Sequence, residues 1–217
     1  MFYNICLGIS IILLLIGLWY VWTCIQHQWV CNDIYEQKPL YTKYKVLRGV
    51  FSKKECKEII REAENYGSIH GWTTRRHDDY PTTDNLMTDA WVNYEPVMQQ
   101  IKSVIFPSLV ELFELKPNLL RMEETFIARY DADVKDAQTA LGPHEDGSEF
   151  SFIVALNDDY NGGGTHFIKK NKIVHLNTGD AVIFCGQTTH SGLPVIQGTR
   201  FIMPGFIYYG WCIQQYE

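Results

Sequence analysis

Three residues in the second half of the chain could together bind a divalent metal ion. His144 and Asp146 lie two positions apart in the segment GPHEDGSEF, and on an extended backbone this spacing points both side chains to one face. Two ligands hold a divalent ion poorly, so a third is required. His190 follows Asp146 by 44 positions, ahead of another turn and strand that could return it to the same place. Taken alone, the His-x-Asp pair is also explained by a turn histidine that Asp146 caps.

Two imidazoles and one carboxylate favour iron over zinc. They form the facial triad of non-haem Fe(II) oxygenases, which leaves open positions for a cosubstrate and dioxygen, whereas zinc more often requires tetrahedral closure. Arg200 lies ten residues after His190, and a strand beginning there would point its guanidinium into the site. A buried guanidinium needs an anion, and its planar fork suits a carboxylate. A dicarboxylate such as 2-oxoglutarate could therefore bind iron at one end and Arg200 at the other.

Short strands must position these residues. From Asn118 onward, β-branched and aromatic runs alternate with clusters of Gly, Asn and Asp. We expect six strands, within LLRMEETFIARY, EFSFIVAL, THFI, KIVHL, AVIFC and RFIMPGFIYY. Their regular spacing indicates a sandwich or barrel, and the sequence has no fixed period of the kind that solenoids and propellers show.

Helices are expected before the strands. Residues 52–55, SKKE, form a capping box that begins an amphipathic helix ending at Gly67. A second helical stripe covers residues 97–113 and should kink or break at Pro107. Residues 71–87 are polar and turn-rich, which predicts a long functional loop or a short edge hairpin. The predicted fold class is α+β, mainly β: a double-stranded β-helix, or jelly roll, buttressed by N-terminal helices and preceded by one transmembrane helix.

The amino-terminal segment has the composition of a membrane anchor. Residues 1–32 contain no Asp, Glu, Lys or Arg, and residues 5–22 would span roughly 27 Å as a helix, close to the hydrocarbon core. Aromatic rings cluster at the end of this stretch, where they prefer the headgroup level. A signal peptide is disfavoured because the segment has no basic n-region and no small-x-small cleavage site. We expect a single-pass membrane protein.

The side of the membrane stays open at this point. Basic residues after the span favour a cytosolic body by the positive-inside rule. A nascent or secreted substrate would instead favour a lumenal body in the endoplasmic reticulum. Six cysteines are scattered without a CxxC pair, so they are expected to be small buried hydrophobes rather than zinc ligands.

The composition describes one ordinary globular domain behind this leader. The 217 residues carry 19 basic and 25 acidic side chains, for a net charge of -6, and 46% of them are hydrophobic. Net acidity argues against a nucleic-acid partner, because phosphate binding requires a surplus of Lys and Arg. The composition leaves the oligomeric state open.

Five stretches together match a known family. YPTTDNLM, FIARY, PHEDGSEFSFIVALN, YNGGGTHF and THSGLPVIQGTRFIMPGF resemble the Fe(II)/2-oxoglutarate-dependent dioxygenases. Within that family they are most similar to the procollagen lysyl hydroxylase and prolyl 4-hydroxylase catalytic domains, over about residues 52–209. The collagen prolyl hydroxylases usually carry Lys in place of Arg200, which favours the lysyl branch. Thr165 after the glycines is closer to the prolyl branch, so the hydroxylated residue stays open.

The resemblance implies a role for each predicted site residue. His144, Asp146 and His190 would bind Fe(II), and Arg200 would pair with the 5-carboxylate of 2-oxoglutarate. L-ascorbate would keep the iron ferrous. Two further residues, Tyr130 and Thr165, would line the cosubstrate pocket, with ordinary strand packing as the alternative for either. The stretch WTTRRHDDY would border the substrate cleft, where its acidic pair could orient a lysine ammonium; a solvated loop is the alternative.

The domain organisation follows from the apolar leader together with this resemblance, and the activity follows from the resemblance. We expect an N-terminal anchor over residues 1–24, a linker over residues 25–48 and the dioxygenase domain over residues 49–217. The expected reaction is hydroxylation of a peptidyl residue, lysine in collagen-like chains, with release of succinate and carbon dioxide. Prolyl 4-hydroxylation is the alternative. A small-molecule oxygenase and a metal-free jelly-roll binding module are the less favoured ones.

Overall fold

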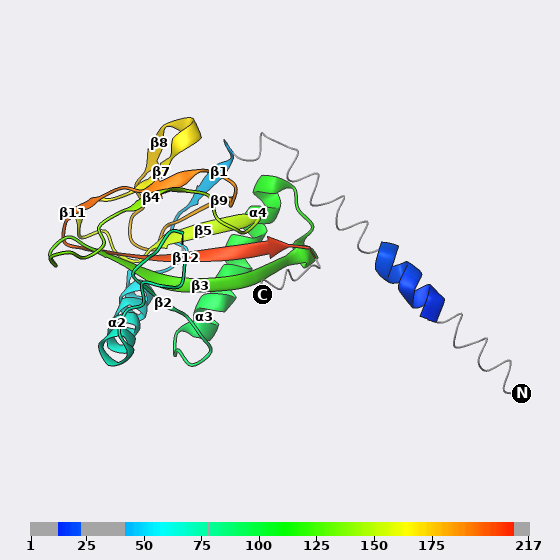
Figure 1. Ribbon diagram of the computed structural model, residues 1–217, viewed down its shortest axis with the longest axis horizontal. Coiled ribbons are helices and arrows are strands. Elements are labelled where there is room, and N and C mark those ends of the chain that lie inside the picture. Colours follow the sequence, from blue (N-terminus) through cyan, green and yellow to red (C-terminus); the bar gives the residue numbers. More distant parts are fainter. Residues whose placement is uncertain (1–12, 23–41, 78, 211–217) are drawn as a thin grey trace, which may run out of the picture. The chain divides into compact units, whose positions relative to one another are not determined.

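The computed structural model describes residues 13–22, 42–77 and 79–210 (Figure 1). One compact unit covers residues 39–209 and holds the sheets and the other helices. Residues 13–22 belong to a second unit, where they are helical with exposed side chains.

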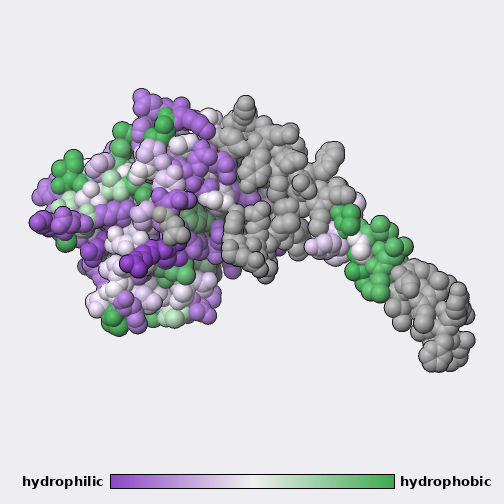
Figure 2. All heavy atoms as spheres, viewed as in Figure 1, coloured by the Kyte–Doolittle hydropathy of each residue, from purple (hydrophilic) through white to green (hydrophobic). Residues whose placement is uncertain are grey.

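The predicted membrane anchor lies only partly within the described residues. Residues 13–22 are apolar, and Figure 2 shows this helix as hydrophobic; residues 1–12 and 23–24 lie outside the described residues. No helix in the described part of the chain is long and apolar enough to cross a bilayer. The membrane-spanning helix stays a prediction from the sequence.

The larger sheet has six strands, in the order β1-β9-β5-β12-β3-β2, and all neighbours are antiparallel. These strands are β1 (Tyr44–Leu47), β2 (Asp84–Leu86), β3 (Leu120–Asp131), β5 (Phe150–Ala155), β9 (Ala181–Cys185) and β12 (Thr199–Tyr209). Every residue of β5 and β9 is buried. Because successive strand residues point to opposite faces, both faces of the sheet centre must be covered.

A smaller antiparallel sheet covers one face. Its strands, in the order β4-β10-β7-β8, are β4 (Leu141–His144), β10 (His190–Gly192), β7 (Thr165–Phe167) and β8 (Lys172–Val174). A two-stranded ribbon joins β6 (Asn161–Gly162) to β11 (Val195–Gln197). The core between the sheets includes Phe167 and Phe184, whose ring centroids lie 5.2 Å apart. The mainly β, jelly-roll sandwich that the sequence predicts is therefore observed.

Helices cover the other face of the larger sheet (Figure 1). Helix α2 (Lys53–His70) begins at the predicted capping box: Glu55 N donates to Ser52 Oγ at 3.2 Å, and Ser52 N donates to Glu55 Oε2 at 2.7 Å. The helix continues past Gly67, which packs under the indole of Trp72 rather than ending the helix. Gly71 is the C-cap residue, and its N–H donates to the carbonyl of Gly67 at 2.9 Å.

The second helical stripe is interrupted before its proline. Helix α3 (Tyr94–Gln100) passes into a π-helical turn (Ile101–Ile105), and α4 (Phe106–Phe113) follows with Pro107 in its first turn. The π-helical turn ends directly before the proline: Phe106 N–H donates to the carbonyl of Ile101, five residues earlier, and Pro107 has no N–H to donate. The ring of Phe113 lies 4.8 Å from that of Phe150, so α4 packs on β5. Two short 3₁₀ turns (Pro117–Leu119 and Ile168–Lys170) complete the fold.

Part of the predicted linker belongs to the fold. Residues 44–47, within the expected linker 25–48, form β1 and pair with β9. The ring of Tyr44 stacks on that of Phe167 with centroids 4.7 Å apart. Four residues are too few to show a strand period in the sequence. Both cysteines among the described residues, Cys56 and Cys185, are free and buried, as expected.

Candidate active site

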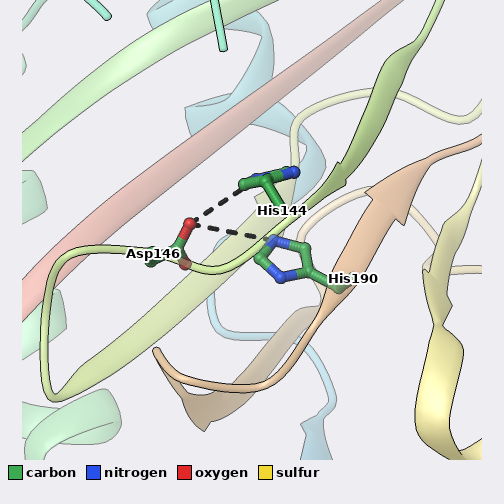
Figure 3. A group of neighbouring side chains, drawn as sticks. All are labelled: His144, Asp146 and His190. Carbon is green, nitrogen blue, oxygen red and sulfur yellow. Dashed lines mark ion pairs between the residues drawn. The ribbon is translucent and has the colours of Figure 1, made fainter. Parts of the chain in front are cut away.

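The three predicted metal ligands meet at one end of the smaller sheet (Figure 3). His144 ends β4, Asp146 follows in the next turn, and His190 begins β10 as the register partner of His144. Asp146 Oδ1 lies 3.5 Å from His144 Nε2 and 3.9 Å from His190 Nε2. One potential ligand atom from each residue lies within 4.8 Å of the other two, so a single ion could contact all three.

The other ring nitrogen fixes the orientation of each imidazole. His144 Nδ1 lies 2.8 Å from the carbonyl oxygen of Gly142, and His190 Nδ1 lies 2.9 Å from that of Thr188. Because a carbonyl can only accept, both Nδ1 atoms carry the proton and both Nε2 lone pairs are free for a metal. Burial lowers the pKa of His190, against the charge of Asp146, which raises it. The neutral imidazole that a metal requires is thereby favoured.

The donor set fits Fe(II). Within the described residues no fourth His, Cys, Asp or Glu joins the group. Neighbouring Glu145 instead accepts a hydrogen bond from the Thr189 hydroxyl at 2.6 Å and lies 3.8 Å from Lys169 Nζ. Two imidazoles and one carboxylate leave the remaining positions of an octahedral ion to other ligands.

The triad opens onto a cavity of about 400 Å³. Its lining also contains the three other residues predicted for the cosubstrate: Tyr130, Thr165 and Arg200. Arg200 on β12 is the register partner of Tyr130 on β3. The structure thus brings all six predicted site residues to one cavity.

Arg200 is a buried cation without a carboxylate partner among the described residues. Only 4% of its surface is exposed, its Nε has no hydrogen-bond partner, and Nη1 lies a long 3.4 Å from the carbonyl oxygen of Gly164. Aromatic rings flank the guanidinium carbon, which lies 5.7 Å from the centroid of Tyr130 and 6.0 Å from that of Tyr160. Since a buried, unpaired charge is unfavourable, this position fits the carboxylate of an anionic ligand.

The two hydroxyl residues are suited to the same carboxylate. Tyr130 and Thr165 are 3% and 2% exposed, respectively. Burial raises the pKa of Tyr130 to about 12, although the charge of Arg200 opposes this change. The phenol is therefore neutral at physiological pH and can donate a hydrogen bond.

A glycine lets Tyr160 and Arg200 pack together, and adding a methyl group there should weaken binding of 2-oxoglutarate. A Cβ at Gly163 would lie 2.8 Å from Tyr160 Cε2 and 3.2 Å from Arg200 Cδ, and its φ of 64° is strained for alanine. We expect Gly163→Ala to raise the Kd of 2-oxoglutarate about tenfold or more, measured by calorimetry with Mn(II) in place of Fe(II). Gly142→Ala is the control, because a Cβ there meets nothing within 4 Å. Equal Kd values for the two variants would contradict this packing role.

The structure also shows cavity residues to which the sequence analysis gave no individual role. His77, Tyr80 and Thr82 line the cavity together with Asp79, and the ring of Tyr80 lies 5.1 Å from that of His144. Two signals in the sequence indicated a functional loop here: the polar, turn-rich character of the segment, and the resemblance that places WTTRRHDDY at the border of the substrate cleft. The acidic pair proposed there is half described, because Asp78 lies outside the described residues.

Similar proteins include the collagen lysyl hydroxylases. The chain is 33% identical over 174 residues to the human multifunctional procollagen lysine hydroxylase and glycosyltransferase LH3, which covers 73% of this chain and 22% of that protein. Human procollagen-lysine,2-oxoglutarate 5-dioxygenase 2 is 32% identical over 172 residues, with the same coverage. The chain thus spans about a fifth of the length of these relatives. No family model matches the sequence.

Solved structures with the same fold include prolyl hydroxylases. The viral collagen prolyl hydroxylase of Paramecium bursaria Chlorella virus-1, in its 2-oxoglutarate complex, has a TM-score of 0.59 at 20% identity, covering 77% of this chain and 97% of that one. A Pseudomonas putida prolyl-4-hydroxylase has a TM-score of 0.62 at 14% identity, covering 77% and 93%.

The jelly roll and its His-Asp-His cluster define the class of non-haem iron oxygenases. Within this class, the chain belongs to the Fe(II)/2-oxoglutarate-dependent dioxygenases, in the group of the procollagen lysyl hydroxylase and prolyl 4-hydroxylase catalytic domains. The cofactors predicted from the sequence, Fe(II), 2-oxoglutarate and L-ascorbate, are those of this family.

Proposed function

We propose that this protein is a 2-oxoglutarate-dependent dioxygenase that hydroxylates lysine in collagen-like peptides. One observation carries the proposal: a convergent His-Asp-His cluster opens onto the same cavity as a buried arginine that has no carboxylate partner among the described residues. A metal-free binding module would not require this combination of ligands and unpaired charge.

One set of site residues would bind the metal and another set the cosubstrate. His144, Asp146 and His190 would hold Fe(II), with both imidazoles oriented by backbone carbonyls. Arg200 would bind the 5-carboxylate of 2-oxoglutarate through a charge-assisted fork, and Tyr130 would donate its phenolic proton to the same group. When bound, Fe(II), 2-oxoglutarate and dioxygen supply the oxidising chemistry, with succinate and carbon dioxide as products and L-ascorbate keeping the iron ferrous.

Apolar side chains of the cavity complete the site. Phe126, Ile153 and Ile202 lie in the cavity lining and belong to the core between the sheets. Their side chains limit the water that can reach the metal, which strengthens electrostatic contacts within the cavity.

The lysine assignment rests on the relatives and on the charge of the cavity. The relatives that share 30–33% identity with the chain are named as lysine hydroxylases. Two acidic side chains, Asp79 and Glu145, line the cavity outside the triad, and Asp79 is exposed. An ammonium group would be attracted to this charge, whereas proline offers none. Prolyl hydroxylation remains the second candidate, since solved prolyl hydroxylases share the fold.

The membrane anchor is part of the same proposal. An uncharged, predominantly apolar sequence over residues 5–22 supports a single-pass tether. A lumenal domain in the endoplasmic reticulum would place the site beside nascent collagen-like chains. Protease protection of the full chain in sealed microsomes tests this arrangement, and digestion of the domain without detergent would contradict it.

Succinate release decides between the candidate substrates. The purified protein is supplied with Fe(II), 2-oxoglutarate and ascorbate, and with collagen-like peptides that contain either X-Lys-Gly or X-Pro-Gly. We expect the lysine peptide to stimulate succinate release and to gain one oxygen atom by mass spectrometry. Stimulation by the proline peptide alone would assign the prolyl branch, and the absence of both iron binding and turnover would overturn the proposal.

A further inference from the structure

A polar segment borders the cavity with little backbone support. Residues 74–83 form a loop whose two ends meet at an isolated antiparallel β-bridge between Thr73 and Asp84. Among the described residues from 74 to 82, no backbone group bonds to another backbone group. Gln138 fastens the later part, because its Nε2 donates to Pro81 O at 2.9 Å and its Oε1 accepts from Thr83 N at 2.6 Å. In the earlier part, Arg75 N donates to Thr73 Oγ1 at 3.3 Å, and the side chain of Arg76 makes the contacts with the larger sheet.

Arg76 reaches from this segment to two carboxylates of the larger sheet. Its Nε lies 2.5 Å from Oδ1 of Asp84 on β2. Its Nη1 and Nη2 each donate to one oxygen of Glu124 on β3, both at 3.1 Å. This two-pronged geometry is available to arginine and not to lysine.

Loss of Arg76 would leave the carboxylate of Asp84 buried without a cationic partner. Its side chain is fully buried, and its second oxygen accepts a hydrogen bond from the Thr82 hydroxyl. Burial by itself would lower the pKa of Arg76, but the hydrogen bonds and charges of Glu124 and Asp84 outweigh burial and raise the pKa. The guanidinium is therefore a permanent charged anchor for the segment.

The anchor also touches the cavity lining. The guanidinium carbon of Arg76 lies 4.8 Å from the ring centroid of Phe126, and the ring of His77 lies 5.3 Å from that of Phe126 and 6.1 Å from that of Phe206. Both phenylalanines and His77 line the cavity. Arg76 Nη2 lies 3.3 Å from His77 Nε2, which also lies 3.9 Å from Glu124 Oε1. Arg76 and its partner Glu124 thus hold a cavity residue in position.

We infer that Arg76 is a positioning residue for the primary substrate: it holds residues 76–82, apart from the undescribed Asp78, as one wall of the cavity. The other end of the cavity is formed by Arg200, Tyr130 and Thr165 on β12, β3 and β7, and the hydrogen bonds of the Arg76 side chain go to Asp84, Glu124 and His77 instead. The inference rests on the proposed function, in that the cavity must receive a substrate. Loss of the anchor should therefore weaken binding of the peptide and leave binding of 2-oxoglutarate unchanged.

Arg76→Gln tests this role, and Arg75→Gln is a matched control because Arg75 is an exposed arginine at the adjacent position. Hydrogen exchange of the peptide covering residues 73–84 is measured by mass spectrometry in the ligand-free protein. The readout is the protected fraction of this peptide, because the N–H groups of Thr73, Arg75, Thr83 and Asp84 donate hydrogen bonds. We expect exchange at least about tenfold faster in Arg76→Gln and unchanged in Arg75→Gln. The KM for the X-Lys-Gly peptide should rise about tenfold, while the Kd of 2-oxoglutarate, measured with Mn(II), should change less than about twofold.

Two further variants separate positioning from folding. Arg76→Gln leaves Asp84 as a buried, unpaired carboxylate, so the double variant Arg76→Gln, Asp84→Asn removes that charge as well. It should regain thermal stability and retain the fast exchange. Arg76→Lys keeps the charge without the fork and should give intermediate exchange.

Three outcomes would overturn the inference. The first is that Arg76→Gln exchanges no faster than Arg75→Gln. The second is that Arg76→Gln loses affinity for the peptide and for 2-oxoglutarate to the same extent. The third is that Arg76→Gln exchanges faster but keeps the wild-type KM for the peptide. The proposed function fails separately, when the wild-type protein turns over neither peptide. In that case fast exchange in Arg76→Gln would still establish the anchor.

Discussion

His144→Ala is expected to abolish turnover and to lower Fe(II) affinity by more than about a hundredfold. Loss of a residue that merely orients a metal ligand typically lowers affinity or activity by about 10- to 100-fold, so loss of the ligand itself should exceed that range. The remaining Asp146 and His190 would offer two donors, which hold a divalent ion poorly. Fe(II) affinity is measured anaerobically by competition with a chromogenic chelator, and turnover by succinate release.

His166→Ala is the matched control for the loss of an imidazole. His166 lies on β7, opposite Ser191 of β10, but is absent from the cavity lining, and its Nε2 lies 3.3 Å from Asn171 Oδ1. We expect this variant to keep its Fe(II) affinity and turnover. Wild-type Fe(II) affinity in His144→Ala would show that the triad is not the metal site.

Local patterns in the sequence were sufficient to predict the strands that carry Tyr130, Thr165 and Arg200, but not the short strands β4 and β10 that carry His144 and His190. The capping box at Ser52 and the apolar runs of β5 and β9 each act through neighbours in the chain, so their signals are local. His144 and Asp146 share a short segment for the same reason. The third ligand, His190, could be proposed because a jelly roll returns its strands to one end, a property of the fold class.

Contacts between distant segments could not be predicted in the same way. Arg76 pairs with Glu124, 48 positions later, and neither residue has a local pattern that marks the pair. β1 is four residues long, and its partner β9 lies more than a hundred positions away. Gly67 looked like a helix stop, but the structure uses the missing side chain for close contact with Trp72. Such features depend on contacts between residues far apart in the chain, and these contacts leave no local pattern in a single sequence.

Arg200→Met is expected to have opposite effects on ligand binding and on stability. Removing one partner of a buried, hydrogen-bonded charge pair costs about 2–5 kcal/mol, so the Kd of 2-oxoglutarate should rise about thirtyfold or more. In the ligand-free protein, however, the same substitution removes a 4% exposed cation whose Nε has no hydrogen-bond partner. Replacing buried ionic groups with apolar ones often stabilises by about 1–4 kcal/mol, so Tm should rise by roughly 2 °C or more.

The opposite signs distinguish a binding residue from a structural one. If Arg200 served only to stabilise β12, Arg200→Met would lower Tm and would affect 2-oxoglutarate binding only through unfolding. Arg129→Met is the matched control, because Arg129 lies on the neighbouring β3 with Asp131 3.5 Å away and its guanidinium 5.2 Å from the Trp72 ring, outside the cavity lining. This variant should bind 2-oxoglutarate normally. If Arg200→Met raises Tm and loses affinity for 2-oxoglutarate, and Arg129→Met does not, then Arg200 is a binding residue. Its charge destabilises the ligand-free protein and is required by the ligand.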